Sequence, residues 1–273
     1  SIFEPAGYNV ITANTGQKGI ESAISNSPDI IILDLMMPDK SGFEVAHILK
    51  NRPDTQNIPI IILTAKELTI NDRLKLAGKA KKIMQKSHFS KEDLLFQIRD
   101  LQLMFPQRAG LYDEISGLFD NSYFQLRLAQ EICRGLRYKN VFSIVVLDVD
   151  SFTEYVKANG IHRANMVIKK IADLIKKSVR GGDTVVRYGI DEFAIILSNT
   201  PKDPALTVAN RFISFIEHYP FYNVSCMPNG KLTASASVVF FPKEGETVEE
   251  LINKSYKLLK KAKKSGGNRV EYL

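Results

Sequence analysis

The sequence predicts an α/β protein built from two modules. Its 273 residues exceed the length at which a single hydrophobic core usually keeps growing. Hydrophobic residues make up 44% of the chain and charged residues 25%, which is ordinary globular composition. Short, continuously apolar runs alternate with helical patterns in the first third, and such strands are typical of parallel sheets covered on both faces. We therefore expect two domains of ordinary size.

In the first module, hydrophobic periodicity separates strands from helices. The predicted strands are 8–11, 29–33 and 58–63, and the predicted helices are 16–24 and 43–49. Ser90 and Asp93 have the spacing of an N-cap and its N3 acid, so another helix should begin there. It should end near Phe105, because a proline follows. We expect a first domain at 1–103, a linker at 104–112 and a second domain at 113–273.

The second module has a different order of elements. A strand at 142–148 precedes a helix at 164–179, which the glycines at 181 and 182 should end. A short turn at 189–192 should join two strands, and a capping box, Thr247 with Glu250 at N3, should open the last helix. The remaining predicted elements are the strands 184–188, 193–197 and 232–240 and the helix 206–216.

Composition excludes several classes of protein. No apolar run approaches the about 20 residues that a membrane helix needs, so we expect no membrane span. The first residues do not resemble a signal peptide, and two cysteines, Cys133 and Cys226, occur outside any metal-binding pattern, so we expect a cytoplasmic protein. The net charge of +7 lies mostly beyond residue 105 without a nucleic-acid-binding motif, so no polymeric nucleic acid is expected as a partner.

Three residues that follow or end strands of the first module suggest phosphate chemistry. Asp34, Thr64 and Lys86 each stand at the carboxyl end of an apolar run. In a doubly wound sheet these ends gather at one edge, so the three side chains could meet there. A carboxylate nucleophile, a hydroxyl donor and an ammonium group are what transient phosphorylation of an aspartate requires. Taken alone, an aspartate after a strand is as easily a loop residue or a helix cap.

Together with LMMPDKSGFEV at 35–45 and LTA at 63–65, these residues resemble the receiver domain of two-component response regulators. The resemblance implies a flavodoxin-like fold, Asp34 as the phosphoacceptor, Thr64 and Lys86 as switch residues, and a sensor histidine kinase or phosphotransfer protein as partner. The family opens with a strand that carries an acidic pair for Mg²⁺, and this sequence begins after it. We therefore expect a sheet without its first strand, an incomplete metal site, and apolar surface that a partner chain could cover.

Four stretches of the second module carry another resemblance. DEISGL at 113–118, LDVDSF at 147–152, RYGIDEF at 187–193 and GGNRV at 266–270 resemble the GGDEF domain of diguanylate cyclases. The resemblance implies an α/β fold with a central mixed sheet related to nucleotidyl cyclases, and a homodimer that condenses two GTP into cyclic di-GMP. Asp148 and Asp191 would converge on Mg²⁺, which favours oxygen ligands. With Glu192 and Lys263 they form the residual cyclase site.

The base-binding part of that site departs from the family. The asparagine and the aspartate that bind guanine have become Val156 and Asn165, and the second glycine of the turn has become Ile190. We expect Gly189 to keep the positive φ of a type II′ turn while Ile190 narrows the pocket. Buried polar groups of a ligand that lose their partners cost about 1–3 kcal/mol each, so recognition of guanine should fail.

Phosphate binding departs from the family too. The family's lysine and C-terminal arginine have become Thr153 and Gly267, and a histidine has become Ile161, while Lys263 remains. Two cations that would offset the charge of a triphosphate are therefore missing. The concentration of these changes in one pocket indicates a degenerate cyclase site.

A second family site is retained. Arg180 and Asp183 match the RxxD motif that binds cyclic di-GMP, and Arg211 falls where the family often places another arginine of this site. Arginine can pair with the O6/N7 edge of guanine, and aspartate can accept from its N1/N2 edge. On its own, the segment would be an ordinary helix end with a surface ion pair.

Three hypotheses follow. The leading one is a receptor or effector that binds cyclic di-GMP through Arg180, Asp183 and Arg211 and passes the signal to a downstream protein. The second is a weakly active diguanylate cyclase. The third is a scaffold that binds no nucleotide.

Overall fold

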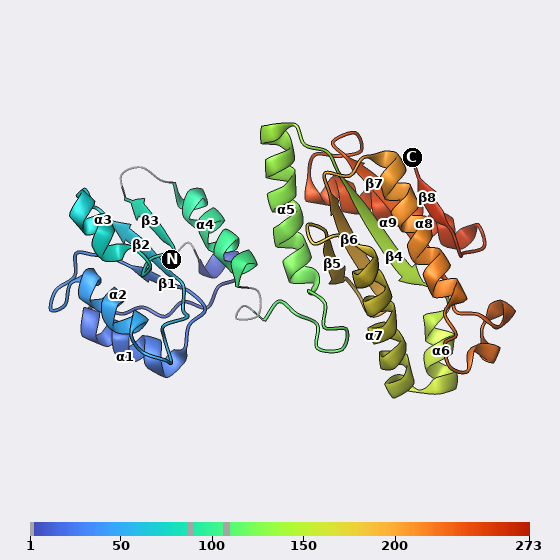
Figure 1. Cartoon of the computed structure of the whole chain (residues 1–273), viewed down its shortest axis with the longest axis horizontal. Helices are drawn as coiled ribbons and strands as arrows, with labels where there is room; N and C mark the ends of the chain where they lie inside the picture. Colours follow the sequence, from blue (N-terminus) through green and yellow to red (C-terminus); the bar gives the residue numbers. More distant parts are fainter. Residues whose placement is uncertain (1–2, 87–89, 106–109) are drawn as a thin grey trace. The chain divides into compact units, whose positions relative to one another are not determined.

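The computed structural model describes residues 3–86, 90–105 and 110–273 of the chain. The chain divides into two compact units, Ser1–Ala109 and Gly110–Leu273 (Figure 1). The ends of the predicted linker belong to these units, because Met104 is the last residue of a helix and Leu111 is buried. Residues 106–109 of the linker lie outside the described residues.

The first unit contains a parallel sheet in the order β1-β2-β3. Its strands are β1 (Ile31–Leu33), β2 (Ile60–Thr64) and β3 (Lys82–Gln85), and its helices are α1 (Gly16–Asn26), α2 (Gly42–Lys50), α3 (Ile70–Leu76) and α4 (Lys91–Met104). Successive residues of β2 face opposite sides of the sheet. Ile60 and Ile62 pack with residues of α1 and α2, and Ile61 packs with residues of α4. Helices therefore cover both faces, as predicted.

The strand predicted at 8–11 is wrong. These residues have no regular secondary structure, and no described strand pairs with them. An extended segment becomes part of a sheet only when a neighbour supplies the ladder of hydrogen bonds, and Tyr8 makes another contact instead. Its hydroxyl donates to Gln102 Oε1 of α4 at 3.0 Å, and its ring packs against the cluster that includes Ile61 and Leu94. The predicted capping box of Ser90 and Asp93 is present.

The second unit contains a mixed sheet in the order β5-β6-β4-β7-β8, in which only the pair β7–β8 is parallel. The strands are β4 (Phe142–Val149), β5 (Thr184–Arg187), β6 (Glu192–Ser198), β7 (Ala234–Phe241) and β8 (Val270–Tyr272). The helices are α5 (Asn121–Tyr138), α6 (Phe152–Asn159), α7 (Ile161–Ser178), α8 (Lys202–His218) and α9 (Val248–Lys264).

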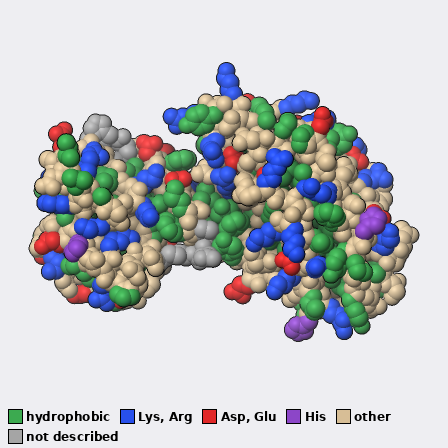
Figure 2. All heavy atoms as spheres, in the orientation of Figure 1, with side chains coloured by type: hydrophobic (Ala, Val, Ile, Leu, Met, Phe, Trp, Pro, Cys, Tyr) green, Lys and Arg blue, Asp and Glu red, His purple; other side chains and the backbone are tan. Residues whose placement is uncertain are grey.

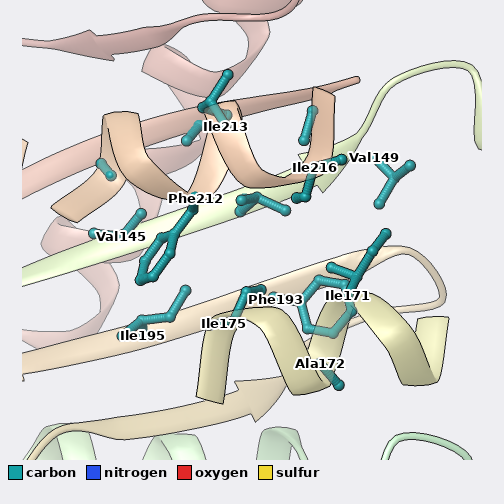
Figure 3. Close-up of a cluster of buried hydrophobic side chains, with 14 of the residues drawn as sticks. Val145, Val149, Ile171, Ala172, Ile175, Phe193, Ile195, Phe212, Ile213 and Ile216 are labelled. Carbon is teal, nitrogen blue, oxygen red and sulfur yellow. The ribbon is translucent and has the colours of Figure 1, made fainter. Parts of the chain in front are cut away.

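The main core lies between this sheet and helices α7 and α8. Phe193 and Ile195 of β6 meet Ile171 and Ile175 of α7, with Phe212 of α8 beside them (Figure 3). Helix α9 packs against β4 and β7, and α5 packs against β5 and β6. Side chains alternate along a strand, so the polar end of β4, at Asp148, faces α9 whereas Leu147 enters the main core.

Helix α7 differs from its prediction at both ends. It begins at Ile161, three residues early, and ends at Ser178, with Val179 already extended. The glycines at 181 and 182 therefore lie in the following loop and do not end the helix. Within the described parts of the chain, no helix is long and apolar enough to cross a membrane.

Candidate functional site

The three residues predicted for phosphate chemistry meet at one edge of the β1-β2-β3 sheet. Asp34 follows β1 directly, Thr64 ends β2 and Lys86 follows β3 directly. Lys86 Nζ lies 2.5 Å from Asp34 Oδ2, and the Lys86 amide donates to the Thr64 carbonyl oxygen at 2.9 Å. Thr64 is fully buried, and its Oγ1 accepts the amide of Lys66 at 3.1 Å. The acid and the ammonium group thus bond directly, as the sequence predicts, and Thr64 stands at the same edge of the sheet, joined to Lys86 through the backbone.

Asp34 carries a negative charge at neutral pH. Desolvation disfavours its ionised form, but the bond from Lys86 and the amide of Met36 outweigh that cost and hold the pKa of Asp34 below its usual value. The Met36 amide donates to Oδ1 at 3.0 Å. Asp39, in the same loop, is oriented by the backbone, because its two oxygens accept the amides of Gly16 and Gln17 at 2.8 and 3.1 Å.

In the second unit, Asp148 and Lys263 form a direct ion pair. Lys263 Nζ lies 2.6 Å from Asp148 Oδ2, and Asp148 is only 4% exposed. The other oxygen, Oδ1, is buried and has no hydrogen-bond partner among the described residues. Burial raises the pKa of Asp148 to about 7, the pairing with Lys263 lowers it, and the charges of Asp191 and Glu192 add to the rise. The four predicted residues of the residual cyclase site are therefore close neighbours.

Glu192 has a partner that the sequence does not suggest. The hydroxyl of Tyr256, on α9, donates to Glu192 Oε2 at 2.8 Å. Burial raises the pKa of Tyr256, and the bond to Glu192 raises it further. Helix α9 thus contacts both strand acids, holding Asp148 through Lys263 and Glu192 through Tyr256.

The turn that carries Ile190 is held by side chains. The Arg187 guanidinium donates to the carbonyl oxygens of Gly189 and Ile190 at 3.2 and 2.7 Å, and pairs with both carboxylate oxygens of Asp113 at 3.1 Å. The predicted type II′ turn is wrong, because neither Gly189 nor Ile190 has a positive φ. The loop is longer and closes where the Tyr188 amide donates to the Glu192 carbonyl oxygen at 2.8 Å. A Cβ at position 189 would lie 2.9 Å from Glu192 Oε2, so a larger residue there would require the Glu192 side chain to shift.

The fit of these acids to Mg²⁺ is partial. The unpartnered buried oxygen of Asp148 suits a hard cation, and Asp191 lies near enough to influence its pKa. Lys263 already neutralises the other oxygen of Asp148. Within 3–86, 90–105 and 110–273, no group of three or more His, Cys, Asp or Glu side chains is placed to hold a metal ion. If an ion binds here, Asp148 and Asp191 would hold it, and it would supply positive charge to a phosphate.

The substituted positions carry apolar or uncharged groups. Ile190 and Ile161 are 75% and 57% exposed, and Val156 packs against the main core. Thr153 is exposed on α6 and Asn165 is half-buried on α7. Gly267 has φ +70°, and a Cβ there would lie 3.0 Å from Asp150 Oδ2.

Asp150 is a residue that sequence reasoning missed. Its oxygens accept the hydroxyls of Thr233 and Ser235 at 2.8 and 2.7 Å and the amide of Asn268 at 3.0 Å. It therefore joins the ends of β4 and β7 to the loop after α9. The sequence feature that could have indicated Asp150 is its position as the second acid of the LDVDSF stretch. Asp113 and Arg187 lie within the DEISGL and RYGIDEF stretches, but only the structure reveals that they pair.

The RxxD segment forms a tight loop after α7. Asp183 Oδ2 accepts the Arg180 amide at 2.9 Å, and Oδ1 accepts the Ser198 amide at 3.2 Å. The surface ion pair considered for this segment is not found among the described residues, since Asp183 bonds to backbone groups and the Arg180 side chain is exposed. Arg211 Nη2, on α8, donates to the Ser178 carbonyl oxygen. This bond holds the Arg211 guanidinium at a carbonyl group that precedes Arg180 by two residues in the sequence.

The surroundings of this loop are basic and open. Lys176 and Lys177 occupy the last turn of α7 and are exposed. A Cβ at Gly181 or Gly182 would meet no atom within 4 Å, so the backbone is accessible. Figure 2 shows several Lys and Arg side chains on the drawn face of the second unit. The loop therefore combines a free guanidinium, a fixed carboxylate and accessible backbone.

Two protein-family models match this chain, each over a different part of it. The response regulator receiver domain matches residues 1–99, and the diguanylate cyclase GGDEF domain matches residues 110–269. Response regulator PleD of Caulobacter vibrioides is 24% identical over 259 residues, which cover 89% of this chain and 56% of PleD. Diguanylate cyclase A of Treponema denticola is 31% identical over 135 residues, 48% of this chain and 35% of that protein. The chain spans only about half or less of the length of these relatives.

Solved structures agree with the fold of the second unit. Diguanylate cyclase SiaD of Pseudomonas aeruginosa, in complex with its activator SiaC, is 25% identical with a TM-score of 0.56, covering 67% of this chain and 68% of SiaD. The GGDEF domain of DgcB of Caulobacter crescentus, in complex with c-di-GMP, is 20% identical with a TM-score of 0.54, covering 60% of this chain and 93% of that domain. The chain therefore belongs to the GGDEF family of diguanylate cyclase domains, and it carries a response regulator receiver domain before the GGDEF domain.

Proposed function

We propose that the GGDEF domain of this protein is a receptor for cyclic di-GMP, which it binds at Arg180, Asp183 and Arg211 and does not synthesise. The observation that carries this proposal is the position of Arg211, whose guanidinium bonds to the Ser178 carbonyl beside the RxxD loop. The Arg211 guanidinium from α8 is thus held at the end of α7, beside the loop that carries Arg180. Two arginines and an acid suit a ligand that has guanine edges and phosphates.

The charges and hydrogen-bond capacity of the loop support this ligand class. Each Asp183 oxygen accepts one backbone amide and keeps a second lone pair, so the carboxylate can still accept from a guanine N1/N2 edge. Arg180 is exposed and can turn toward the O6/N7 edge. Lys176 and Lys177 add positive charge beside the loop, which favours an anionic dinucleotide.

The substrate pocket argues against synthesis. Ile190 and Ile161 expose apolar side chains where the family has a glycine and a histidine, and Val156 can form no hydrogen bond to a base. Lys263, the remaining phosphate-binding lysine, is paired with Asp148. A triphosphate would have to compete with that carboxylate for the same ammonium group.

Calorimetry of the full chain with cyclic di-GMP tests the receptor proposal. We expect micromolar or tighter binding, a loss of at least about tenfold in Arg180→Ala, which is 1.4 kcal/mol, and a smaller loss in Arg211→Ala. Lys169→Ala is the matched control, because it removes a positive charge from an exposed position on α7 outside the loop. Absence of binding heat in the wild type at high ligand concentration would sink the proposal.

A weak diguanylate cyclase is the second candidate, and the grouping of Asp148, Asp191, Glu192 and Lys263 favours it. Incubation of the protein with GTP and Mg²⁺, followed by chromatography, distinguishes the two. Dinucleotide that forms in the wild type and is lost in Asp191→Ala would establish synthesis. If neither GTP nor cyclic di-GMP changes the thermal stability, the scaffold that binds no nucleotide is left, since a ligand that binds the native state must stabilise it.

The receiver domain supplies the input in this proposal. Asp34 would accept a phosphoryl group from a histidine kinase or phosphotransfer protein, with Lys86 neutralising the new charge and Thr64 donating to it. Phosphorylation would then control homodimer formation and the output to a downstream protein. Chromatographic mass measurement with and without a phosphoryl-mimicking beryllium fluoride complex tests this step, with Asp34→Asn as the control that cannot respond.

A further inference from the structure

Ser198 links the RxxD loop to helix α5 through two different groups. It is the last residue of β6, and its amide donates to Asp183 Oδ1 at 3.2 Å. Its hydroxyl donates to Glu131 Oε1 of α5 at 2.8 Å. One residue therefore contacts both the acid of the RxxD motif and a carboxylate of the first helix of this unit.

Glu131 is itself firmly held. It is 8% exposed, and the Arg127 guanidinium donates to the same Oε1 at 2.7 Å, with Arg134 Nη1 at 3.9 Å. A buried carboxylate needs such partners, because an unpaired charge away from water is costly. The hydrogen bonds form a continuous chain from the Arg180 amide through Asp183, Ser198 and Glu131 to Arg127.

The main chain around Ser198 is fixed as well. Thr200 Oγ1 donates to the Ser198 carbonyl oxygen at 2.9 Å, and Ser143 Oγ donates to the Thr200 carbonyl oxygen at 2.6 Å. Ser198 also pairs with Phe142 at the end of the β4–β6 ladder. The Ser198 amide is thus aimed at Asp183 by contacts on both sides of the residue.

We infer that Ser198 and Glu131 are positioning residues, which orient the Asp183 carboxylate for its ligand and couple the RxxD loop to helix α5. The inference rests on the proposed function only for the identity of the ligand. Ser198 does not need to touch the dinucleotide. It holds Asp183 Oδ1 so that the remaining lone pairs face outward, and a ligand that uses them strengthens a chain of bonds ending in α5.

Amide hydrogen exchange of the full chain tests the inference without ligand. In Ser198→Ala the bond to Glu131 is lost, so the protection of the Ser198 and Arg180 amides should fall about threefold to tenfold, equivalent to a net hydrogen bond of about 1 kcal/mol. Ser198→Thr keeps the hydroxyl and should retain the protection. Ser214→Ala removes an exposed serine hydroxyl from α8 and should leave both amides unchanged.

A double-mutant cycle with cyclic di-GMP tests the coupling. Ser198→Ala and Glu131→Ala should each weaken binding about threefold to tenfold, and the double variant should be no weaker than either alone, because both break the same chain. Ser198→Thr should restore the affinity.

The outcomes separate the inference from the proposed function. Wild-type exchange rates at Arg180 in Ser198→Ala, or additive losses in the double variant, would overturn the inference and leave the receptor in place. A wild type that binds no cyclic di-GMP, with lowered protection in Ser198→Ala, would remove the receptor and keep Ser198 as the residue that orients Asp183.

Discussion

The ammonium group of Lys263 lies 2.6 Å from Oδ2 of Asp148, a carboxyl group buried at the end of β4. Burial still raises the pKa of Asp148 to about 7, because desolvation and the charges of Asp191 and Glu192 outweigh this attraction. The pair therefore neutralises the acid only partly. An aspartate whose pKa lies near neutrality should make the free energy of unfolding of the domain depend on pH.

The first prediction concerns the pH dependence of unfolding. The folded-state pKa of Asp148 is raised from 3.8 to about 7, so between these values the native state binds the extra proton. Its contribution to stability is present below the unfolded pKa and is lost as the pH rises through the folded pKa. Asp148→Asn removes this loss, so its free energy of unfolding relative to wild type should increase from pH about 5 to about 8, by on the order of 1–3 kcal/mol.

Urea unfolding at a series of pH values measures this difference. Asp173→Asn, an exposed acid on α7, is the control and should give a difference that does not change over the same range. A difference for Asp148→Asn that is constant with pH would show that the carboxyl group is ionised throughout.

The second prediction concerns the turn at 189–192. The Arg187 side chain is 10% exposed and bonds to Asp113, Gly189 and Ile190 at once. A lysine ammonium cannot reach all three with the same geometry, so Arg187→Lys should lower the free energy of unfolding by about 1–3 kcal/mol. Lys231→Ala, which breaks a more exposed pair with Glu217, should cost less than about 1 kcal/mol.

The pairing of Asp113 with Arg187 should also make the stability of the domain depend on pH. Desolvation opposes its ionisation, but bonds from Ser116 and Arg187 outweigh that cost and hold its pKa below the usual value. Its contribution is therefore present above the unfolded pKa and lost as the pH falls through the folded pKa. Asp113→Asn should be less stable than wild type at neutral pH, and the gap should close in acid. An equal gap at every pH would contradict the assignment.

The extent to which the sequence predicts this fold depends on where each element obtains its stability. Strands β1 and β2 consist mostly of isoleucine and leucine, and β4 is buried along its whole length and apolar apart from Ser143 and Asp148, so the sequence identifies all three as strands. The segment at 8–11 has the same kind of pattern, but a strand also needs a neighbour. Asp120 caps α5 by accepting the Tyr123 amide, but with tyrosine at N3 no capping box marks this start in the sequence, and Ser151 before α6 makes no capping bond at all.

The residues of the candidate sites also differ in how far the sequence predicts their contacts. Residues at strand ends, such as Asp34 and Lys86, could be brought together from topology alone, because the ends of parallel strands share an edge. The contacts that helix residues make could not be predicted from topology in this way. Tyr256 and Glu131 reach the site from helix faces whose rotation depends on the packed core, so no spacing in the sequence indicates that they bond to Glu192 and Ser198.

The third prediction concerns the close approach of α2 to Asp34, the proposed phosphoacceptor. A Cβ at Gly42 would lie 2.2 Å from the Asp34 carbonyl oxygen and 2.7 Å from the Leu35 Cα, both of which are backbone atoms. Gly42→Ala should therefore destabilise the receiver domain by about 1–3 kcal/mol, as overpacking does, and slow the acceptance of a phosphoryl group by Asp34. Gly19→Ala, where the Cβ would meet only Ala13 at 3.9 Å, should not destabilise. Thermal unfolding of both variants decides the matter.

The last prediction separates the two candidate sites of the GGDEF domain. Tyr256 bonds to Glu192 beside the turn at 189–192, which follows β5, whereas Asp183 immediately precedes β5, at its other end. Tyr256→Phe keeps the ring and removes one hydrogen bond, so it should cost about 1 kcal/mol of stability and release the Glu192 carboxylate. Because the RxxD loop lies at the far end of the strand, the affinity for cyclic di-GMP should not change.

Calorimetry of Tyr256→Phe and Asp191→Ala beside Arg180→Ala makes the comparison. The receptor proposal requires that the first two variants bind the dinucleotide like the wild type and that only the third loses it. A loss of binding in Tyr256→Phe or Asp191→Ala, with folding intact by circular dichroism, would place the ligand in the cyclase-like pocket. The acids held by α9 would then be a functional binding site and not the remnant of one.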